Sequence, residues 1–144
     1  IRMLPGLEAM GIRMLLNECE VLTRAGEHLY LAGIDDAHYY RADNIEKAAA
    51  AIPHGHSCAI LLSHTPEIYK RAAHSEFSLM LSGHTHGGQI WPFSLLVRLV
   101  DRRVAGVYRQ GASLLYVSRG IRYWGPPMRL CAPHELSLLT LRAG

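Results

Sequence analysis

The stretch Phe77-Ser78-Leu79-Met80-Leu81-Ser82-Gly83-His84-Thr85-His86-Gly87-Gly88-Gln89 decides the fold of this chain. Its first five residues form an apolar run that predicts a buried strand, and the glycine-rich part that follows predicts a turn. A second apolar run, at 59–62, leads likewise into Ser63-His64-Thr65-Pro66. Because open α/β sheets bind ligands at the carboxyl ends of their strands, we expect the histidines of both turns to lie at one rim.

The surrounding pattern predicts an α/β fold, with a mixed β-sheet and flanking helices. Strands over 28–32, 58–62 and 77–81 alternate with helices over 44–52 and 66–73, an order typical of parallel pairing by right-handed crossovers. Asp43 and Thr65 are the expected N-caps of these two helices. We also expect a helix over 4–10, short strands over 12–16 and 19–22, a hairpin of 104–108 and 113–117, a loop over 118–133, and a last strand over 135–141.

Composition narrows the class of protein. With 144 residues, 49% of them hydrophobic and 19% charged, the chain can bury the core of one domain. No apolar run approaches the roughly 18 residues of a membrane span. Three widely spaced cysteines favour reduced thiols and weakly a reducing compartment. We therefore expect a cytoplasmic or membrane-associated protein.

Three histidines are candidate metal ligands. His84 and His86 share one side of a turn whose glycines let the backbone approach an ion, and imidazole is the commonest nitrogen ligand of catalytic metals. Such a pair is weak evidence by itself, and His64 strengthens it. The alternative for His64 is that it only caps the helix that follows. His54 and His56 form a second pair at the opposite strand ends, where we expect exposure to solvent.

Two carboxylates and a fourth histidine follow the strand over 28–32. For Asp35 and Asp36 we favour ordering of the loop, or of a ligand histidine, over direct metal binding. His38 is an accessory candidate at the same rim.

The motifs Ser63-His64-Thr65-Pro66 and Gly83-His84-Thr85-His86-Gly87-Gly88-Gln89 closely resemble the last two metal motifs of calcineurin-like metallophosphoesterases. Gly33-Ile34-Asp35-Asp36 and Tyr116-Val117-Ser118-Arg119-Gly120 are similar to the bacterial, membrane-associated branch of that family. Some members of this branch act on lipid-linked or nucleotide-linked phosphodiesters. The resemblance covers about 11–141, nearly the whole chain.

The resemblance implies a centre of two divalent or trivalent ions, of manganese, iron or zinc. His64 and His84 would bind one ion, and His86 would bind the other. The amino-terminal motifs Gly-Asp and Gly-Asn-His of the family do not occur in this sequence. We therefore expect residues 1–144 to be the carboxyl-terminal part of a single domain, half of an αββα sandwich, with the amino-terminal half as its partner. No catalytic residue is assigned within this chain.

The implied function is phosphoester hydrolysis, most of all of phosphodiesters, by a metal-bridging hydroxide. Gly87, Gly88, Gln89 and Arg119 are candidate substrate contacts. Packing of the loop is an equal alternative for Gln89, and a surface role is an equal alternative for Arg119. Because three neutral histidines cannot neutralise two cations, we expect the chain alone to be inactive. A half sandwich would also expose apolar surface, so we expect isolated material to self-associate.

The rival interpretation is a non-catalytic metal-binding or interaction module, including a mononuclear site with Asp35 or Asp36 as fourth ligand. Nucleic-acid binding has little support, because the arginine-rich loop carries only Tyr123-Trp124 as aromatic residues. That dipeptide, beside Pro126-Pro127, would instead rest on a lipid headgroup layer or line the substrate cleft. The sequence leaves open the substrate, the native metals, the oligomeric state and whether a membrane anchor precedes Ile1.

Overall fold

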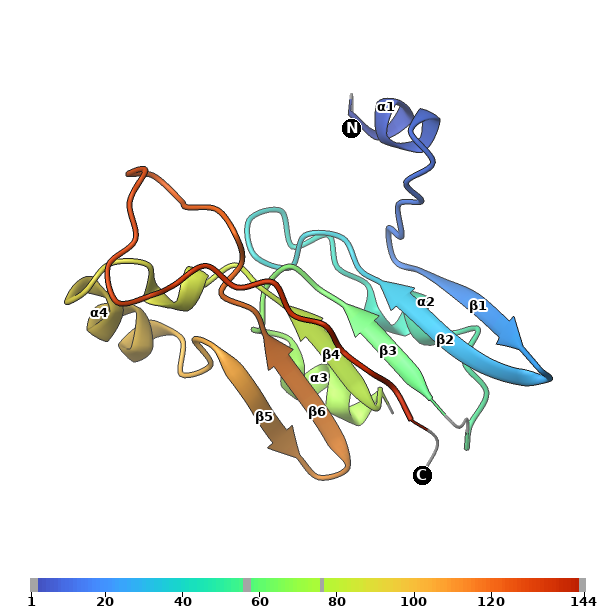
Figure 1. Ribbon diagram of the computed structural model, residues 1–144. Coiled ribbons are helices and arrows are strands. Elements are labelled where there is room, and N and C mark those ends of the chain that lie inside the picture. The colour runs from blue at the N-terminus through green and yellow to red at the C-terminus, as the bar shows by residue number, and fades with distance from the viewer. Residues whose placement is uncertain (1–2, 56–57, 76, 143–144) are drawn as a thin grey trace.

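The computed structural model describes residues 3–55, 58–75 and 77–142. Within these ranges, six strands form one sheet in the order β1-β2-β3-β4-β6-β5 (Figure 1). The strands are β1 (Glu18–Arg24), β2 (Glu27–Gly33), β3 (Ala59–Leu62), β4 (Leu79–Ser82), β5 (Gly106–Gln110) and β6 (Ser113–Val117). The helices are α1 (Leu4–Ala9), α2 (Ile45–Ala49), α3 (Tyr69–His74) and α4 (Phe93–Val100), with a 3-10 turn η1 (His86–Gly88).

The sheet is mixed, as the sequence predicts. β2, β3, β4 and β6 are parallel neighbours, whereas β1 and β5 pair antiparallel at the two edges. Leu62 of β3 lies opposite Leu81 of β4, so the two strands end side by side. The turns that follow them therefore begin at the same rim of the sheet, which is the expected place for a ligand site.

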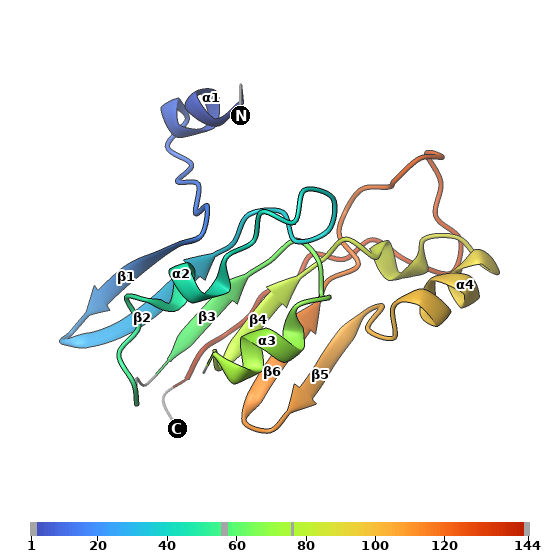
Figure 2. The same cartoon turned by 180° about the vertical axis from the view of Figure 1, so that it is seen from behind.

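The core lies between the sheet and one layer of helices. α2 and α3 cover the same face of the sheet (Figures 1 and 2). Leu61, Met80 and Leu115 point to that face and are fully buried against Ile45 of α2 and Tyr69 of α3. Burial of these side chains is the main favourable term for folding, because it removes apolar surface from water.

The opposite face of the sheet is more open. Side chains alternate along a strand, so Leu31, Leu62 and Leu81 point away from the helices. They line an apolar groove that reaches the ring of His64. In the part of the chain that the structure describes, the segment 133–142 runs across this side beside β6 (Figure 1). No helix in the described ranges combines the length and the apolar character needed to cross a bilayer.

Both predicted helix caps were wrong. Helix α2 begins after Asn44, whose side chain accepts a hydrogen bond from Lys47 N at 2.8 Å, so the cap is Asn44 and not Asp43. Helix α3 begins only at Tyr69 and has no side-chain cap. Thr65 is instead buried in the turn after β3, where its carbonyl accepts from Ser63 Oγ and Ser82 Oγ. The turn after β3, which is bonded to Ser82 at the end of β4, thus delays the start of α3.

Three other elements also differ from the prediction. The segment 12–16 forms no strand, and the strand expected at 135–141 has no ladder partner among the described residues. The edge beside β6 is already occupied by β5, and the final segment is held by side chains, since the hydroxyl of Tyr116 contacts Glu135 and Ser137. Helix α4 was not predicted. The expected hairpin is present, with its first strand at Gly106–Gln110.

Candidate metal centre

His64 and His84 face each other at the rim where β3 and β4 end. The turns are joined by a hydrogen bond from Gly83 N to His64 O of 3.0 Å. His84 Nδ1 lies 3.0 Å from His64 Nε2, and the two ring centroids are 4.9 Å apart. The structure therefore brings these two predicted ligands into contact, although their role as ligands stays a prediction.

The pair fits a metal ion chemically. Burial lowers the pKa of His84, and the nearby His64 lowers it further, so the ring favours its neutral, ligating form. Two imidazole nitrogens bound to one tetrahedral zinc ion lie about 3.3 Å apart, from bond lengths of about 2.05 Å. The observed 3.0 Å between His84 Nδ1 and His64 Nε2 is close to that spacing.

The backbone of this turn is held in an unusual conformation. His84, His86 and Gln89 all have positive φ, of 71°, 51° and 50°. Each such residue without glycine's freedom costs on the order of 1 kcal/mol. Such strain persists only where the surrounding structure enforces it, and it is concentrated at functional sites.

His86 points to a different partner. Its Nδ1 lies 3.3 Å from Arg122 O, and because a carbonyl only accepts, the ring donates from Nδ1 and leaves Nε2 free of that bond. Among residues 3–55, 58–75 and 77–142, no group of three or more His, Cys, Asp or Glu is arranged to hold a metal ion. His64, His84 and His86 therefore do not form a three-histidine site for one ion.

The loop after β2 is organised around one carboxylate. Asp36 Oδ1 accepts backbone hydrogen bonds from His38 N at 3.1 Å and Tyr40 N at 2.8 Å. The bond from Tyr40 is the main reason that the pKa of Asp36 lies below its usual range. Asp35 Oδ1 in turn accepts from Asp36 N at 2.7 Å. The Asp36 carboxylate thus accepts hydrogen bonds from its own loop. These bonds explain why the carboxylate is ionised without a bound metal.

His38 extends the row of rings. Its centroid lies 4.9 Å from that of His84, and its Nδ1 is hydrogen-bonded to Glu67 Oε1. Glu67 was not among the predicted site residues. The sequence signal that could have found Glu67 is its place three residues after His64, in the same turn. Of the second histidine pair, His54 is exposed, and His56 lies outside the described residues.

The two consecutive glycines are required by packing. A Cβ at Gly87 would lie 2.9 Å from Arg119 Cγ, and one at Gly88 would lie 2.5 Å from Ser94 Cβ. Both residues also have positive φ, of 66° and 80°. Packing and backbone conformation therefore call for glycine at positions 87 and 88, apart from the predicted approach of a phosphate group.

The side chain of Gln89 is committed to the neighbouring loop. Its Nε2 donates to Trp124 O at 2.6 Å, and its Oε1 accepts from Trp124 N at 2.6 Å. Because Gln89 is 7% exposed, these bonds favour loop packing over contact with a substrate. Arg119 is less buried, and its Nη1 forms an ion pair with Glu135 Oε2 at 3.0 Å.

Comparison with known proteins decides the family. The chain is 37% identical over 142 residues to an uncharacterized metallophosphoesterase of Helicobacter pylori. The aligned region covers 94% of this chain and 37% of that protein. It is 36% identical over 152 residues to a transmembrane protein with metallophosphoesterase domain of Bos taurus, covering 95% of this chain and 34% of that protein. This chain belongs to the metallophosphoesterase family. A putative metallophosphoesterase of Caenorhabditis elegans is 35% identical over 148 residues, covering 94% of this chain and 30% of that protein.

The chain spans about a third of the length of these metallophosphoesterases. No protein-family model and no solved structure matches it. The family name implies a metal cofactor in general.

Arg129 organises this part of the metallophosphoesterase and was not among the predicted site residues. Arg129 donates from Nη2 to His86 O at 2.7 Å and to Arg119 O at 2.8 Å, and from Nε to Ala132 O at 2.6 Å. Its guanidinium thus connects the His86 turn to the loop over 118–133. The sequence showed only that arginines are dense here. The useful signal would have been a loop rich in glycine and proline, whose carbonyls lack ladder partners.

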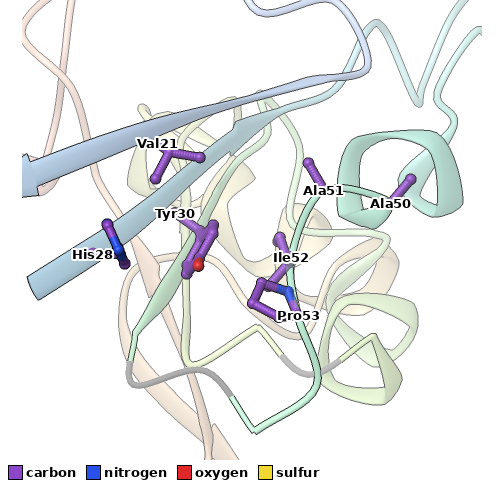
Figure 3. Close-up of a pocket in the computed structure, with 7 residues that line it drawn as sticks. All are labelled: Val21, His28, Tyr30, Ala50, Ala51, Ile52 and Pro53. Atoms are coloured by element: carbon purple, nitrogen blue, oxygen red, sulfur yellow. The ribbon is translucent and has the colours of Figure 1, made fainter.

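A separate pocket lies at the opposite ends of the parallel strands. It is lined by residues of β1, β2 and the segment after α2, namely Val21, His28, Tyr30, Ala50, Ala51, Ile52 and Pro53 (Figure 3). Its lining contains no carboxylate and no second imidazole. The pair of histidines at the carboxyl rim is therefore the better candidate for a metal centre.

Proposed function

We propose that the protein containing this chain is a metal-dependent phosphoester hydrolase that cleaves phosphodiesters at a two-metal centre. The observation that carries this proposal is the 3.0 Å contact between His64 and His84 at the carboxyl rim of parallel strands. The names of the relatives support phosphoester chemistry in general.

In this proposal each residue of the rim has a distinct task. His64 and His84 hold one ion and His86 holds the second, with its ring oriented by Arg122 O. Bound ions of manganese, iron or zinc supply a hydroxide nucleophile and neutralise charge on the phosphoryl group. Gly87 leaves its backbone accessible to a phosphate, whereas Gly88 is buried and supports the turn through its N–H bond to Thr85 O. Arg119 approaches the substrate, which is lipid-linked or nucleotide-linked.

The remaining parts of the centre come from outside this chain. Neutral imidazoles do not offset the charge of two cations, so carboxylate ligands are required. We propose that residues 1–144 are the carboxyl-terminal part of the domain and that the amino-terminal part supplies these carboxylates. The apolar groove lined by Leu31, Leu62 and Leu81 supports this, because a second layer would remove it from water. The chain alone is then inactive.

The test uses the full-length protein. Hydrolysis of bis(p-nitrophenyl) phosphate with added manganese is measured together with bound metal for His64→Ala, His84→Ala and His86→Ala. We expect each variant to lose at least about 10-fold in activity or metal content, since direct ligands matter no less than their supporting groups. His74→Ala is the matched control, because this histidine lies at the end of α3, where its ring bonds to the carbonyl of Lys70 in its own helix.

Unchanged turnover in all three ligand variants would refute the hydrolase proposal. Tight metal retention with no turnover in the wild type would favour the alternative, a non-catalytic metal-binding or interaction module. Faster hydrolysis of phosphomonoesters than of phosphodiesters would contradict the proposed substrate class alone.

A further inference from the structure

Helix α4 presents its apolar side chains to solvent. None of its residues is buried, and its large apolar side chains are the ones that project. The exposed fractions are 52% for Phe93, 48% for Leu95, 56% for Leu96, 80% for Leu99 and 92% for Val100. A helix that covers a protein core shows the reverse pattern, with its apolar stripe facing inward. The outward face of α4 therefore needs an explanation other than the core of this chain.

A second exposed apolar segment lies beside α4. In the loop 121–128, Ile121 is 61% exposed, Tyr123 48%, Trp124 67% and Met128 57%. The loop is fixed in place by Trp91 N donating to Leu130 O at 3.1 Å and by Gln89 bonding to Trp124. Figures 1 and 2 show α4 and this loop at the same end of the molecule, away from the β1–β2 hairpin. We call Trp91, α4 and residues 121–128 the apolar tip.

The charge around the apolar tip is strongly one-sided. Residues 90–130 contain seven arginines and one acidic residue, Asp101, which gives +6, whereas the whole chain carries only +3. Two of these arginines are used within the molecule, because Arg119 pairs with Glu135 and Arg129 bonds to backbone carbonyls. Arg98, Arg102 and Arg122 are exposed next to the apolar side chains. This combination complements a surface that is apolar inside and negatively charged outside.

We propose that the apolar tip docks on an anionic lipid surface. Exposed leucines and phenylalanine would enter the boundary of the acyl chains, where burial removes their apolar surface from water. Trp91, Tyr123 and Trp124 suit the headgroup level, where amphipathic rings accumulate. The arginines pair with lipid phosphates. A protein partner would explain the leucines but would not require exposed arginines beside them.

Docking would place the histidine turn beside the lipid surface. Helix α4 follows η1 after four residues, and Ser94 packs directly on Gly88. The surface inference does not depend on the proposed hydrolase activity, because it rests on exposure and charge at a different set of side chains.

The test exploits the two tryptophans of this chain, both of which lie in the apolar tip. The full-length protein is mixed with vesicles of phosphatidylcholine and phosphatidylglycerol whose acyl chains carry bromine, a short-range quencher. The signal is the difference in fluorescence between the wild type and Trp91→Phe/Trp124→Phe. This difference reports insertion of the tip itself and excludes binding by any other part of the protein.

We expect the difference signal to be quenched and quenching to be lost in Leu96→Glu/Leu99→Glu. Both positions are exposed, so the fold should survive, which an unchanged melting temperature verifies. Met10→Glu, at a position that is 74% exposed directly after α1, is the matched control and should keep full quenching. Arg98→Gln/Arg102→Gln should weaken binding by about thirtyfold, since two basic residues that each contribute about 1 kcal/mol near such a surface together contribute about 2 kcal/mol.

Three results would overturn the inference. One is a difference signal that vesicles leave unchanged, and another is equal quenching in Leu96→Glu/Leu99→Glu. The third is a change in the difference signal that occurs without vesicles, grows with protein concentration and is lost in Leu96→Glu/Leu99→Glu. That result would assign the tip to a contact between copies of the protein. Equal quenching by pure phosphatidylcholine would refute the role of anionic lipid.

Discussion

At the scale of single residues, the histidine turn shows how packing and chemistry share the same positions. His84 has a positive φ and a ring in contact with His64, while the neighbouring Gly88 lies against Ser94. The glycines that flank His84 and His86 let the chain turn sharply at the rim of the sheet. The candidate site thus depends on residues that carry no chemistry of their own.

Substitution of Gly88 tests this dependence. Gly88→Ala would force a Cβ to within 2.5 Å of Ser94 Cβ at a φ of 80°, so we expect a loss of about 2–3 kcal/mol in the free energy of unfolding. Gly83→Ala is the control in the same turn, because a Cβ there meets nothing within 4 Å. Urea unfolding of both variants of the full-length protein measures the difference. Equal stabilities would contradict the packing argument.

At the scale of elements, the loop over 118–133 is held by polar side chains instead of by a ladder. Arg129 donates to the carbonyl of Arg119 within the loop and to that of His86 outside it. Gln89, which precedes α4, bonds to Trp124 of the loop. These bonds explain how a segment rich in glycine and proline positions both His86 and the apolar tip.

Arg129→Lys should loosen this loop. Lysine keeps the charge but cannot reproduce the planar fork that reaches His86, Arg119 and Ala132 at once. We expect a loss of about 2 kcal/mol in stability and faster proteolysis within the loop. Arg122→Lys, whose side chain is exposed, serves as the comparison and should behave like the wild type. Identical cleavage rates in the two variants would argue against the role of Arg129.

The final segment is attached by a carboxylate, which makes its contribution depend on pH. The hydroxyl of Tyr116 donates to Glu135 and is the main reason that the pKa of this carboxylate is lowered, with Arg119 adding to the effect. A carboxylate with a depressed folded pKa stabilises the fold above its unfolded pKa of about 4.3. That contribution is lost as the pH falls through the folded pKa.

Glu135→Gln should therefore cost about 1 kcal/mol at neutral pH and progressively less below about pH 4.3. Denaturant unfolding of wild type and variant at several pH values measures this. A difference in stability that stays constant from neutral to acid pH would show that the charge of Glu135 is not responsible.

At the scale of the whole molecule, helices cover one face of the sheet and leave the other open. The apolar groove on the open face leaves several leucine side chains in contact with water, and it adjoins His64. Metallophosphoesterases related to this chain are about three times as long. In the function proposed above, the amino-terminal part of the domain covers this groove.

The isolated chain should self-associate through this face. Leu31 and Leu81 both line the groove, so Leu31→Glu/Leu81→Lys should shift the material toward monomer, while Val107→Glu on edge strand β5 should not. Sedimentation velocity over a range of concentrations measures the distribution. A concentration-independent monomer of the unsubstituted chain would contradict the expectation.

Local features of the sequence determined the α/β class, the alternation from β2 to β4 and the family motifs. Apolar runs and glycine turns act over a few residues, so they can be interpreted without knowing the partner strand. Only the tertiary structure decided that His64 meets His84, that Asp36 is used by its own loop, and that α4 faces outward. Those outcomes depend on strand register and on contacts between residues far apart in the chain, which no local pattern encodes.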